Sequence, residues 1–468
     1  MTTAPTAPAI PIIPAIPAIP GIPSTPYESY VYAYPHKTAY RPLPERPALA
    51  GLWADEPKGA LSLYLHIPFC EVRCGFCNLF TRVGAPDGLT TAYLDALDRQ
   101  ATAVRAALEA GGEGSGPIRF AAAAFGGGTP TFLTAAELDR LCDIAERRMG
   151  ADLRAVPLSV EASPATATAD RLEVLAARGT TRLSLGVQSF DDTEARSAVR
   201  PQKRAEVEAA LGRIRDAAIP VLNIDLIYGI DGQTELSWRR SLDAALAWRP
   251  EELYLYPLYV RPGTGLGRGS AQEGPAPAWD EQRLRLYRHG RDHLLAHGYE
   301  QVSMRMFRRA GAPAGAADDH ACQTDGMVGL GCGARSYTAR LHYSFDYAVG
   351  MQRIRAIIDD YVATDAAAFA HAQHGWPVTG DEDRRRHLLQ SLLQAEGMEL
   401  AGYRARFGGG PREHFPAELA AFEARGWLDG TDPARLRLSA DGLAHSDAVG
   451  PTLFSAGVRA AMAAYERT

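Results

Sequence analysis

The stretch Tyr64–Phe80, with the sequence YLHIPFCEVRCGFCNLF, places three cysteines directly after a short apolar run. Cys70, Cys74 and Cys77 have C-x-x-x-C-x-x-C spacing and make up half of the chain's 6 cysteines. Three thiolates on one tight loop can ligate three irons of a [4Fe–4S] cluster, because soft sulfur ligands favour iron–sulfur clusters and zinc. The fourth iron then stays open to a substrate or cofactor. The spacing therefore indicates chemistry rather than electron transfer alone.

A structural zinc site and a disulfide are the alternative interpretations of these cysteines. Zinc needs a fourth protein ligand, commonly from a second C-x-x-C or H-x-x-x-H pair, and no such pair follows. His66 lies four residues before Cys70 but belongs to the apolar strand pattern. Few cysteines, three of them clustered, suit a reducing compartment in which disulfides are rare. Ligand number and compartment both favour the cluster.

The composition is that of an ordinary globular protein of 468 residues, 46% hydrophobic and 22% charged. The net charge of −6 gives no reason to expect nucleic-acid binding. No apolar run approaches the roughly 20 residues of a membrane span, and the N-terminus lacks a basic segment before an apolar one. We expect a cytoplasmic protein with no nucleic-acid or membrane partner.

Short apolar runs alternate with amphipathic segments from about Leu61, which predicts βα units around a parallel sheet. The expected strands are Leu61–His66, Phe120–Phe125, Leu158–Glu161, Arg182–Gly186, Val221–Asp225 and Leu253–Pro257. The expected helices are Thr91–Ala110, Ala135–Met149, Ala169–Ala177, Arg204–Ala217 and Glu235–Ala247. Such repeats predict an α/β fold, an open six-unit partial (β/α) barrel whose active site lies at the C-terminal ends of the strands.

Changes in composition predict the domain organisation. Residues 1–26 are proline-rich and should form a disordered extended tail, or a ligand for a proline-reading partner. Residues 27–60 form a tyrosine-rich extension, and residues 61–275 the partial barrel. A helical or loop connection returning to the barrel is expected over 276–380. Helices and a short hairpin over 381–468 predict a winged-helix-like domain without a basic recognition helix.

Several polar or glycine residues follow the expected strands, at the edge where a site should lie. Glycines such as Gly127 and Gly128, after the second strand, let the backbone approach a ligand and leave amides free to bind it. Glu161 and Asp225 end two further strands, and Gln188 follows another at the same edge. A carboxylate in such a position can also merely cap the next helix.

Together these motifs make the chain resemble the radical S-adenosylmethionine (SAM) superfamily. YLHIPFC with CGFC resembles its coproporphyrinogen III oxidase-like group, which includes oxygen-independent coproporphyrinogen III oxidases, haem chaperones, and radical methyltransferases or cyclopropanases. The resemblance implies a [4Fe–4S] cluster on the three cysteines of the motif and SAM on its open iron. The SAM contacts that it implies are Tyr64, Phe76, Gly127, Gly128, Thr129, Glu161, Gln188, Arg200 and Asp225.

The resemblance also implies a reaction. The reduced cluster passes one electron to SAM, giving methionine and a 5′-deoxyadenosyl radical that abstracts hydrogen from a small-molecule substrate. An electron donor such as a flavodoxin or ferredoxin is implied as a partner. The resemblance assigns no catalytic side chain, and the substrate is expected to be porphyrin-like or a natural-product intermediate.

Two departures from the group keep other functions open. Coproporphyrinogen oxidases usually carry a further cysteine two places after the third, where this chain has Leu79. Haem chaperones carry His-Asn-x-x-Tyr, whereas this chain has His320-Ala-Cys-Gln-Thr, although His320 and Cys322 are both competent haem ligands. The first departure counts against coproporphyrinogen decarboxylation, and the loss of the asparagine and the tyrosine counts against haem transfer. A haem-binding chaperone and a methyl or methylene transferase that uses two SAM molecules stay alternatives to the radical enzyme.

Further residues carry weaker expectations. Tyr254 and Tyr256 should share one face of a strand and line the site, or pack in the core. Cys332, in GLGCGARSY, is expected to be a packing residue rather than a fourth cluster ligand. The basic residues Arg305, Arg308 and Arg309 could meet an anionic substrate or form a solvated face.

Overall fold

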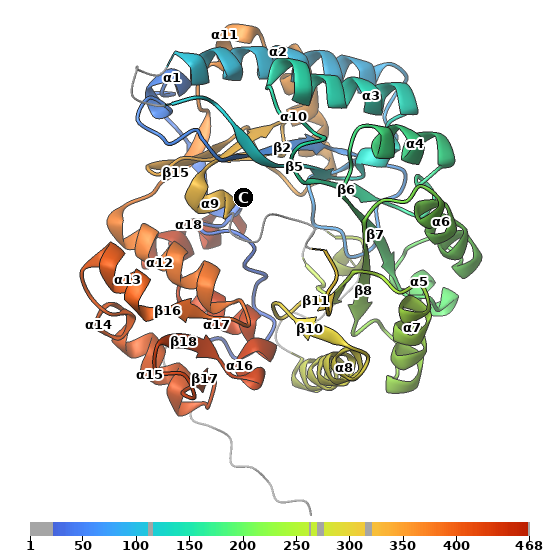
Figure 1. Cartoon of the computed structure of the whole chain (residues 1–468), viewed down its shortest axis with the longest axis vertical. Helices are drawn as coiled ribbons and strands as arrows, with labels where there is room; N and C mark the ends of the chain where they lie inside the picture. Colours follow the sequence, from blue (N-terminus) through green and yellow to red (C-terminus); the bar gives the residue numbers. More distant parts are fainter. Residues whose placement is uncertain (1–21, 111–115, 262–263, 269–275, 314–320, 467–468) are drawn as a thin grey trace, which may run out of the picture.

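A curved sheet of 13 strands dominates the structure, a computed structural model that describes residues 22–110, 116–261, 264–268, 276–313 and 321–466. The strand order is β1-β15-β14-β13-β12-β2-β5-β6-β7-β8-β9-β11-β10. Figure 1 shows the sheet curving like an open barrel, with helices on its outer side. Most of the proline-rich tail, residues 1–21, lies outside the described residues. Within them, no helix combines the length and apolar character of a membrane span.

The six strands expected from the sequence form the middle of this sheet and are all parallel. They are β2 (Leu61–Ile67), β5 (Phe120–Gly127), β6 (Leu158–Ala162), β7 (Arg182–Gln188), β8 (Val221–Tyr228) and β9 (Glu252–Pro257). The connecting helices are α2 (Leu89–Glu109), α3 (Ala135–Asp143), α4 (Ala169–Ala177), α5 (Asp192–Ser197), α6 (Arg204–Asp216) and α7 (Glu235–Ala247). The prediction of a six-unit partial barrel is confirmed; the short helix α5 was not predicted.

Residues 276–380 supply strands at both edges of the sheet as well as helices. The strands are β10 (Tyr299–Gln301), β11 (Met306–Arg309), β12 (Met327–Leu330), β13 (Arg335–Tyr337), β14 (Leu341–Ser344) and β15 (His374–Pro377). The helices are α8 (Pro277–Ala296), α9 (Cys322–Asp325), α10 (Met351–Ala363) and α11 (Ala366–Phe369). Strand β12 pairs in parallel with β2. The GLGCGARSY segment, part of the expected helical or loop connection, is therefore strand, turn and strand.

The C-terminal part has its own three-stranded sheet, in the order β16-β18-β17, and its own apolar core. Its strands are β16 (Met398–Glu399), β17 (Leu428–Asp429) and β18 (Arg435–Leu438). Its helices are α12 (Gly380–Leu392), α13 (Leu400–Phe407), α14 (Pro411–His414), α15 (Pro416–Ala424), α16 (Ala440–Ala444), α17 (Ser446–Thr452) and α18 (Ala456–Glu466). This arrangement of helices and a small sheet matches the expected winged-helix-like fold.

The tyrosine-rich extension runs between the barrel and the C-terminal part (Figure 1). The rings of Tyr27 and Tyr228, on β8, lie 6.3 Å apart. Tyr34 joins the C-terminal core, and its hydroxyl donates to Glu382 on α12. The extension also supplies the short strand β1 (Arg41–Pro42) and the helix α1 (Leu49–Leu52). It therefore contributes to both cores.

A buried ion pair joins the barrel to the C-terminal part. Arg305, beside β11, lies 2.5 Å from Asp447 on α17, and their side chains are 5% and 1% exposed. The Tyr259 hydroxyl also donates to Asp447, and the Tyr30 ring lies 3.8 Å from the Arg305 guanidinium. The expectation that this arginine meets an anionic substrate is wrong, because its charge is already neutralised within the protein.

The two other arginines of that prediction are paired as well. Arg308 lies 3.7 Å from Glu252, and Arg309 lies 2.9 Å from Glu251. Strand β11 is antiparallel to β9, which brings these arginines beside the acids at the start of β9. The sequence could not show this pairing, because the two segments are more than fifty residues apart.

Replacing Asp447 by Asn should lower the unfolding temperature strongly, because it leaves Arg305 charged and buried. Removing one partner of a buried pair typically costs about 3–5 kcal/mol. A matched control is Glu423→Gln, which breaks the 2.9 Å pair with Arg412, whose side chains are 57% and 60% exposed. Thermal unfolding followed by circular dichroism checks both variants. Equal effects of the two substitutions would contradict the prediction.

Candidate functional site

The three cysteines lie on one loop at the C-terminal edge of the sheet. Strand β2 ends at Ile67, and the short strand β3 (Phe69–Cys70) then pairs with β4 (Arg82–Val83), closing the loop at its base. Between these strands, the amide of Cys77 donates to the carbonyl of Cys74 at 3.1 Å. All three cysteines are free thiols and partly buried. The loop therefore carries all three cysteines at the expected edge of the sheet.

Each thiol has a polar neighbour. Cys70 Sγ lies 3.3 Å from the Thr129 hydroxyl, and Cys77 Sγ lies 3.8 Å from the Thr81 hydroxyl. Cys74 Sγ accepts a hydrogen bond from Arg200 at 3.2 Å. Burial raises the pKa of the Cys70 thiol to about 12, against the opposing effect of its hydroxyl neighbour. Binding a metal cluster at such thiols would release their protons.

Gly127 and Gly128 pack against the cysteine-bearing segment so closely that side chains would not fit. A Cβ at Gly127 would lie 2.6 Å from the His66 ring, and the residue has φ +118°. A Cβ at Gly128 would lie 2.6 Å from the carbonyl oxygen of Phe69 and 3.0 Å from Cys70 Sγ. Such contacts are too short for any L side chain, so the glycines let β5 support the cysteine loop.

The amides of this glycine segment are already used within the protein. The amides of Gly128 and Thr129 each donate a hydrogen bond of 2.8 Å to a carbonyl of the segment that carries the first cysteine. The amide of Gly127 donates to Glu161 at 3.0 Å. The expectation that these amides are free to bind a ligand is therefore wrong. The carbonyls and the Thr129 hydroxyl are the polar groups that this segment can offer.

Glu161 lies one residue before the end of β6, as expected, whereas β8 continues to Tyr228, so Asp225 lies within β8 rather than at its end. Burial and, to a smaller extent, the charge of Asp225 raise the pKa of Glu161 to about 7, against the lowering effect of the hydrogen bond from the Gly127 amide. Asp225 accepts hydrogen bonds from Asn223 (2.7 Å) and Ser184 (3.2 Å), and burial raises its pKa as well. Neither Asn223 nor Ser184 was singled out from the sequence.

Gln188 and Arg200 meet where β7 is irregular. The pairing of β7 with β8 shifts register between Gly186 and Gln188, and Gln188 has φ +68°. Arg200 donates to the Gly186 carbonyl at 2.6 Å and to Gln202 at 2.6 Å, besides its bond to the cysteine loop. Gln202 donates in turn to the Val187 carbonyl. Arg200 thus ties the cysteine loop to the end of β7, and Gln202, which the sequence did not reveal, positions it.

Aromatic residues line the same side of the sheet. The Tyr64 hydroxyl lies 3.2 Å from His66 Nδ1, and a Cβ at Gly126 would lie 3.1 Å from both this hydroxyl and Glu161. Phe76 packs against the small apolar cluster that contains Leu258. The structure therefore brings Tyr64 beside the glycine segment and the acid of β6.

Tyr254 and Tyr256 stack with their ring centroids 5.8 Å apart, which confirms that they share one face of β9. Tyr256 also meets Tyr30 of the extension at 6.2 Å. Cys332 is 1% exposed, and its Sγ lies 3.8 Å from the Tyr93 hydroxyl, as expected for a packing residue. Cys322 is partly buried, and His320 lies outside the described residues.

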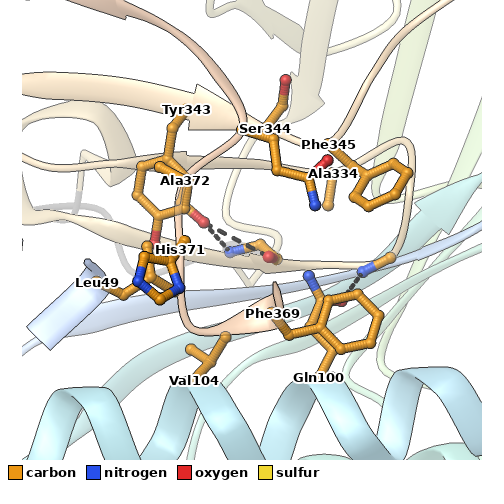
Figure 2. Close-up of a pocket in the computed structure, with 14 residues that line it drawn as sticks. Leu49, Gln100, Val104, Ala334, Tyr343, Ser344, Phe345, Phe369, His371 and Ala372 are labelled. Atoms are coloured by element: carbon orange, nitrogen blue, oxygen red, sulfur yellow. Dashed lines mark hydrogen bonds between the residues drawn. The ribbon is translucent and has the colours of Figure 1, made fainter. Parts of the chain in front are cut away.

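A small cavity of about 30 Å³ lies on the outer side of the sheet, where β12–β14 face α2 and α11 (Figure 2). Gln100 spans it, accepting from the Gly331 amide and the Tyr361 hydroxyl at 2.7 Å each. Its volume suits about a water molecule rather than a substrate. This cavity belongs to the packing that supports the turn between β12 and β13.

Replacing Glu161 by Gln should stabilise the protein near pH 8 and change little near pH 5. The pKa of about 7 exceeds the ordinary value of 4.5, so ionisation destabilises the fold increasingly as pH rises through this window. Gln keeps an oxygen that can accept from Gly127. Thermal unfolding at both pH values checks this, with the surface variant Asp359→Asn as control. A gain in unfolding temperature that is equal at both pH values, or larger near pH 5, would contradict this prediction.

Comparison with known proteins gives the family. Residues 64–245 match the model of the radical SAM superfamily. An oxygen-independent coproporphyrinogen III oxidase of Cereibacter sphaeroides is 30% identical over 367 residues, covering 75% of this chain and 77% of that protein. The haem chaperone HemW of Bacillus subtilis is 26% identical over 383 residues, covering 80% and 94%.

A solved structure shows the same fold. Coproporphyrinogen III oxidase (HemN) from Escherichia coli aligns with a TM-score of 0.73 and 22% identity, over 91% of this chain and 96% of that one. The cofactors of the radical SAM superfamily are a [4Fe–4S] cluster and SAM. From sequence, geometry and fold together, the chain belongs to the radical SAM superfamily, in the family that holds the oxygen-independent coproporphyrinogen III oxidases and the HemW haem chaperones.

Proposed function

We propose that the protein is a radical SAM enzyme that acts on a small-molecule substrate, with a [4Fe–4S] cluster on Cys70, Cys74 and Cys77. One observation carries the proposal: the cysteine loop contacts two of the expected SAM residues directly, Thr129 at Cys70 and Arg200 at Cys74. A cluster there would lie at the strand ends, beside the polar groups that SAM requires.

The donor set fits such a cluster. A cube binds each cysteine through a different iron, so the sulfurs do not need to converge on one point. Thr129 and Arg200 would remain beside the ligating sulfurs, where hydrogen bonds tune a cluster.

When bound, the cluster supplies the electron that cleaves SAM to methionine and a 5′-deoxyadenosyl radical. The residues of the chain would orient SAM. Arg200 matches its carboxylate in charge, and Glu161, Asp225 and Gln188 can accept hydrogen bonds from its amine and hydroxyls. Tyr64, Phe76 and the segment Gly127–Thr129 would complete the contacts. An electron donor such as a flavodoxin or ferredoxin would reduce the cluster.

Anaerobic reconstitution with iron and sulfide, followed by reduction and SAM, should yield 5′-deoxyadenosine. The triple variant Cys70→Ala, Cys74→Ala, Cys77→Ala should yield none, because it cannot hold the cluster. Cys142→Ala, on α3 and away from the loop, is the matched control and should keep the activity of the wild type. Iron content and product are measured together. A fully loaded wild type that forms no product, even with coproporphyrinogen present, would overturn the proposal.

Haem binding is the second candidate function, because the similarity to the haem chaperone covers 94% of that protein. If the radical enzyme is the correct assignment, titration of the reconstituted protein with haem should show no stoichiometric shift of the haem absorption band. Cys322 is the thiol that could ligate haem. A stoichiometric spectrum that disappears in Cys322→Ala would favour the chaperone instead.

A further inference from the structure

Two cations, Lys37 and Arg335, lie near each other without a carboxylate partner. Lys37 begins the short helix η1 (Lys37–Ala39) of the extension, and Arg335 begins β13. Ser336 lines the outer cavity, so its neighbour Arg335 faces the inner side of the sheet. The main electrostatic partners of both cations are tyrosines, and within the described ranges neither forms an ion pair with a carboxylate.

Tyr32 lies between these cations. Its ring centroid is 4.8 Å from the Arg335 guanidinium and 5.9 Å from Lys37 Nζ. Lys37 Nζ is also 4.1 Å from the ring of Tyr347, whose hydroxyl donates at 3.2 Å to the carbonyl of Asn78, directly after the third cysteine. Lys37 is therefore linked to the cysteine loop through Tyr347.

Other buried arginines of the chain have acidic partners. Arg182 lies 2.6 Å from Glu252, and Arg386 lies 2.7 Å from Asp383. By contrast, Nη1 of Arg335 is buried and has no hydrogen-bond partner. Burying a charge without a partner is costly, so natural proteins seldom keep one unless a ligand completes it.

Solvent reaches the group formed by Lys37, Arg335 and Tyr32, because Tyr32 is 39% exposed. This group is also strongly electropositive. Burial alone would raise the pKa of Tyr32, but the charges of Lys37 and Arg335 outweigh it and lower that pKa. Burial and the same charges lower the pKa of His36, which is therefore neutral and adds no further cation.

We propose that Lys37 and Arg335 form a subsite that binds an anionic group of the substrate, a carboxylate or a phosphate, with Tyr32 between them. This rests on the proposed function, which places the substrate beside the cluster. Arg335 offers a planar set of N–H donors to such an anion and Lys37 a compact charge. Because Lys37 belongs to the extension and Arg335 to the sheet, the bound anion would join the two segments.

Thermal unfolding of the reconstituted protein tests the subsite in low-salt buffer. Without added anion, Lys37→Met and Arg335→Met should unfold at or above the wild-type temperature, because neither substitution leaves a carboxylate without its partner. Arg182→Met should unfold lower, because it removes the 2.6 Å partner of the buried Glu252 and leaves that acid only Arg308 at 3.7 Å. The opposite signs separate a ligand-binding cation from a structural one.

Anion addition then tests binding itself. Sodium propionate or sodium phosphate should raise the wild-type unfolding temperature by about 1–3 °C. This rise in unfolding temperature should disappear in Lys37→Met and Arg335→Met. It should persist in Lys203→Met, which changes a lysine outside the proposed subsite. Propionamide, which is uncharged, should have no effect. The larger of the two anion effects identifies the group that the subsite takes.

Two results would overturn the subsite: both methionine variants unfolding well below the wild type, or an equal anion effect in all variants. The assay for 5′-deoxyadenosine in the wild type stays independent of this test. Product formation without an anion effect refutes the subsite alone, whereas an anion effect without product refutes the proposed enzyme.

Discussion

The contact between Gly128 and the Phe69 carbonyl is the constraint on which the site depends. A Cβ would come within 2.6 Å of that oxygen, so β5 can reach the cysteine loop only without a side chain there. This close approach also lets the amide of Thr129 donate a hydrogen bond of 2.8 Å to the same carbonyl. It brings the Thr129 hydroxyl to Cys70 as well. The loop is thus held by backbone atoms of the sheet rather than by its own few residues. A loop supported in this way can keep its sulfurs oriented without a fourth protein ligand.

Charge is distributed unevenly around this loop. Glu161 and Asp225 lie on β6 and β8, and burial raises the pKa of both. Lys37 and Arg335 lie on the side of β12 and β13. Tyr64, on β2, separates the two groups: burial and the charge of Glu161 raise its pKa, whereas Arg335 opposes this. In the proposed complex, the cationic sulfonium of SAM and an anionic substrate would therefore each face charge of the opposite sign.

Local sequence patterns predicted the barrel well because each strand and helix follows its own hydrophobic period. The helices Ala169–Ala177 and Glu235–Ala247 have the predicted bounds, since a clear apolar stripe and polar ends determine them. Six strands were located within a few residues for the same reason. The short strands of β10–β15 were missed, because three or four residues contain too little of a period to be recognised.

The site was only partly predictable, for a different reason. The acids and cysteines of the site could be predicted from the sequence, because parallel strands place their C-terminal ends at one edge of the sheet. The bonding partners of these groups could not be predicted: the Gly127 amide donates to Glu161, the Gly128 amide donates to the cysteine segment, and Arg305 pairs with Asp447. These partners depend on tertiary contacts that no local pattern encodes.

The extension shows why the two parts of the chain are expected to act together. Tyr30 covers the guanidinium of the ion pair between barrel and C-terminal part, and Tyr34 belongs to the C-terminal core. Lys37 lies over the ring of Tyr347, whose hydroxyl bonds to the cysteine loop. These three contacts lie within eight residues. In the proposed complex, an anion bound at Lys37 would therefore be held by the same short segment that packs against both the barrel and the C-terminal part. Substrate binding and the contact between these two parts would then share one segment of backbone.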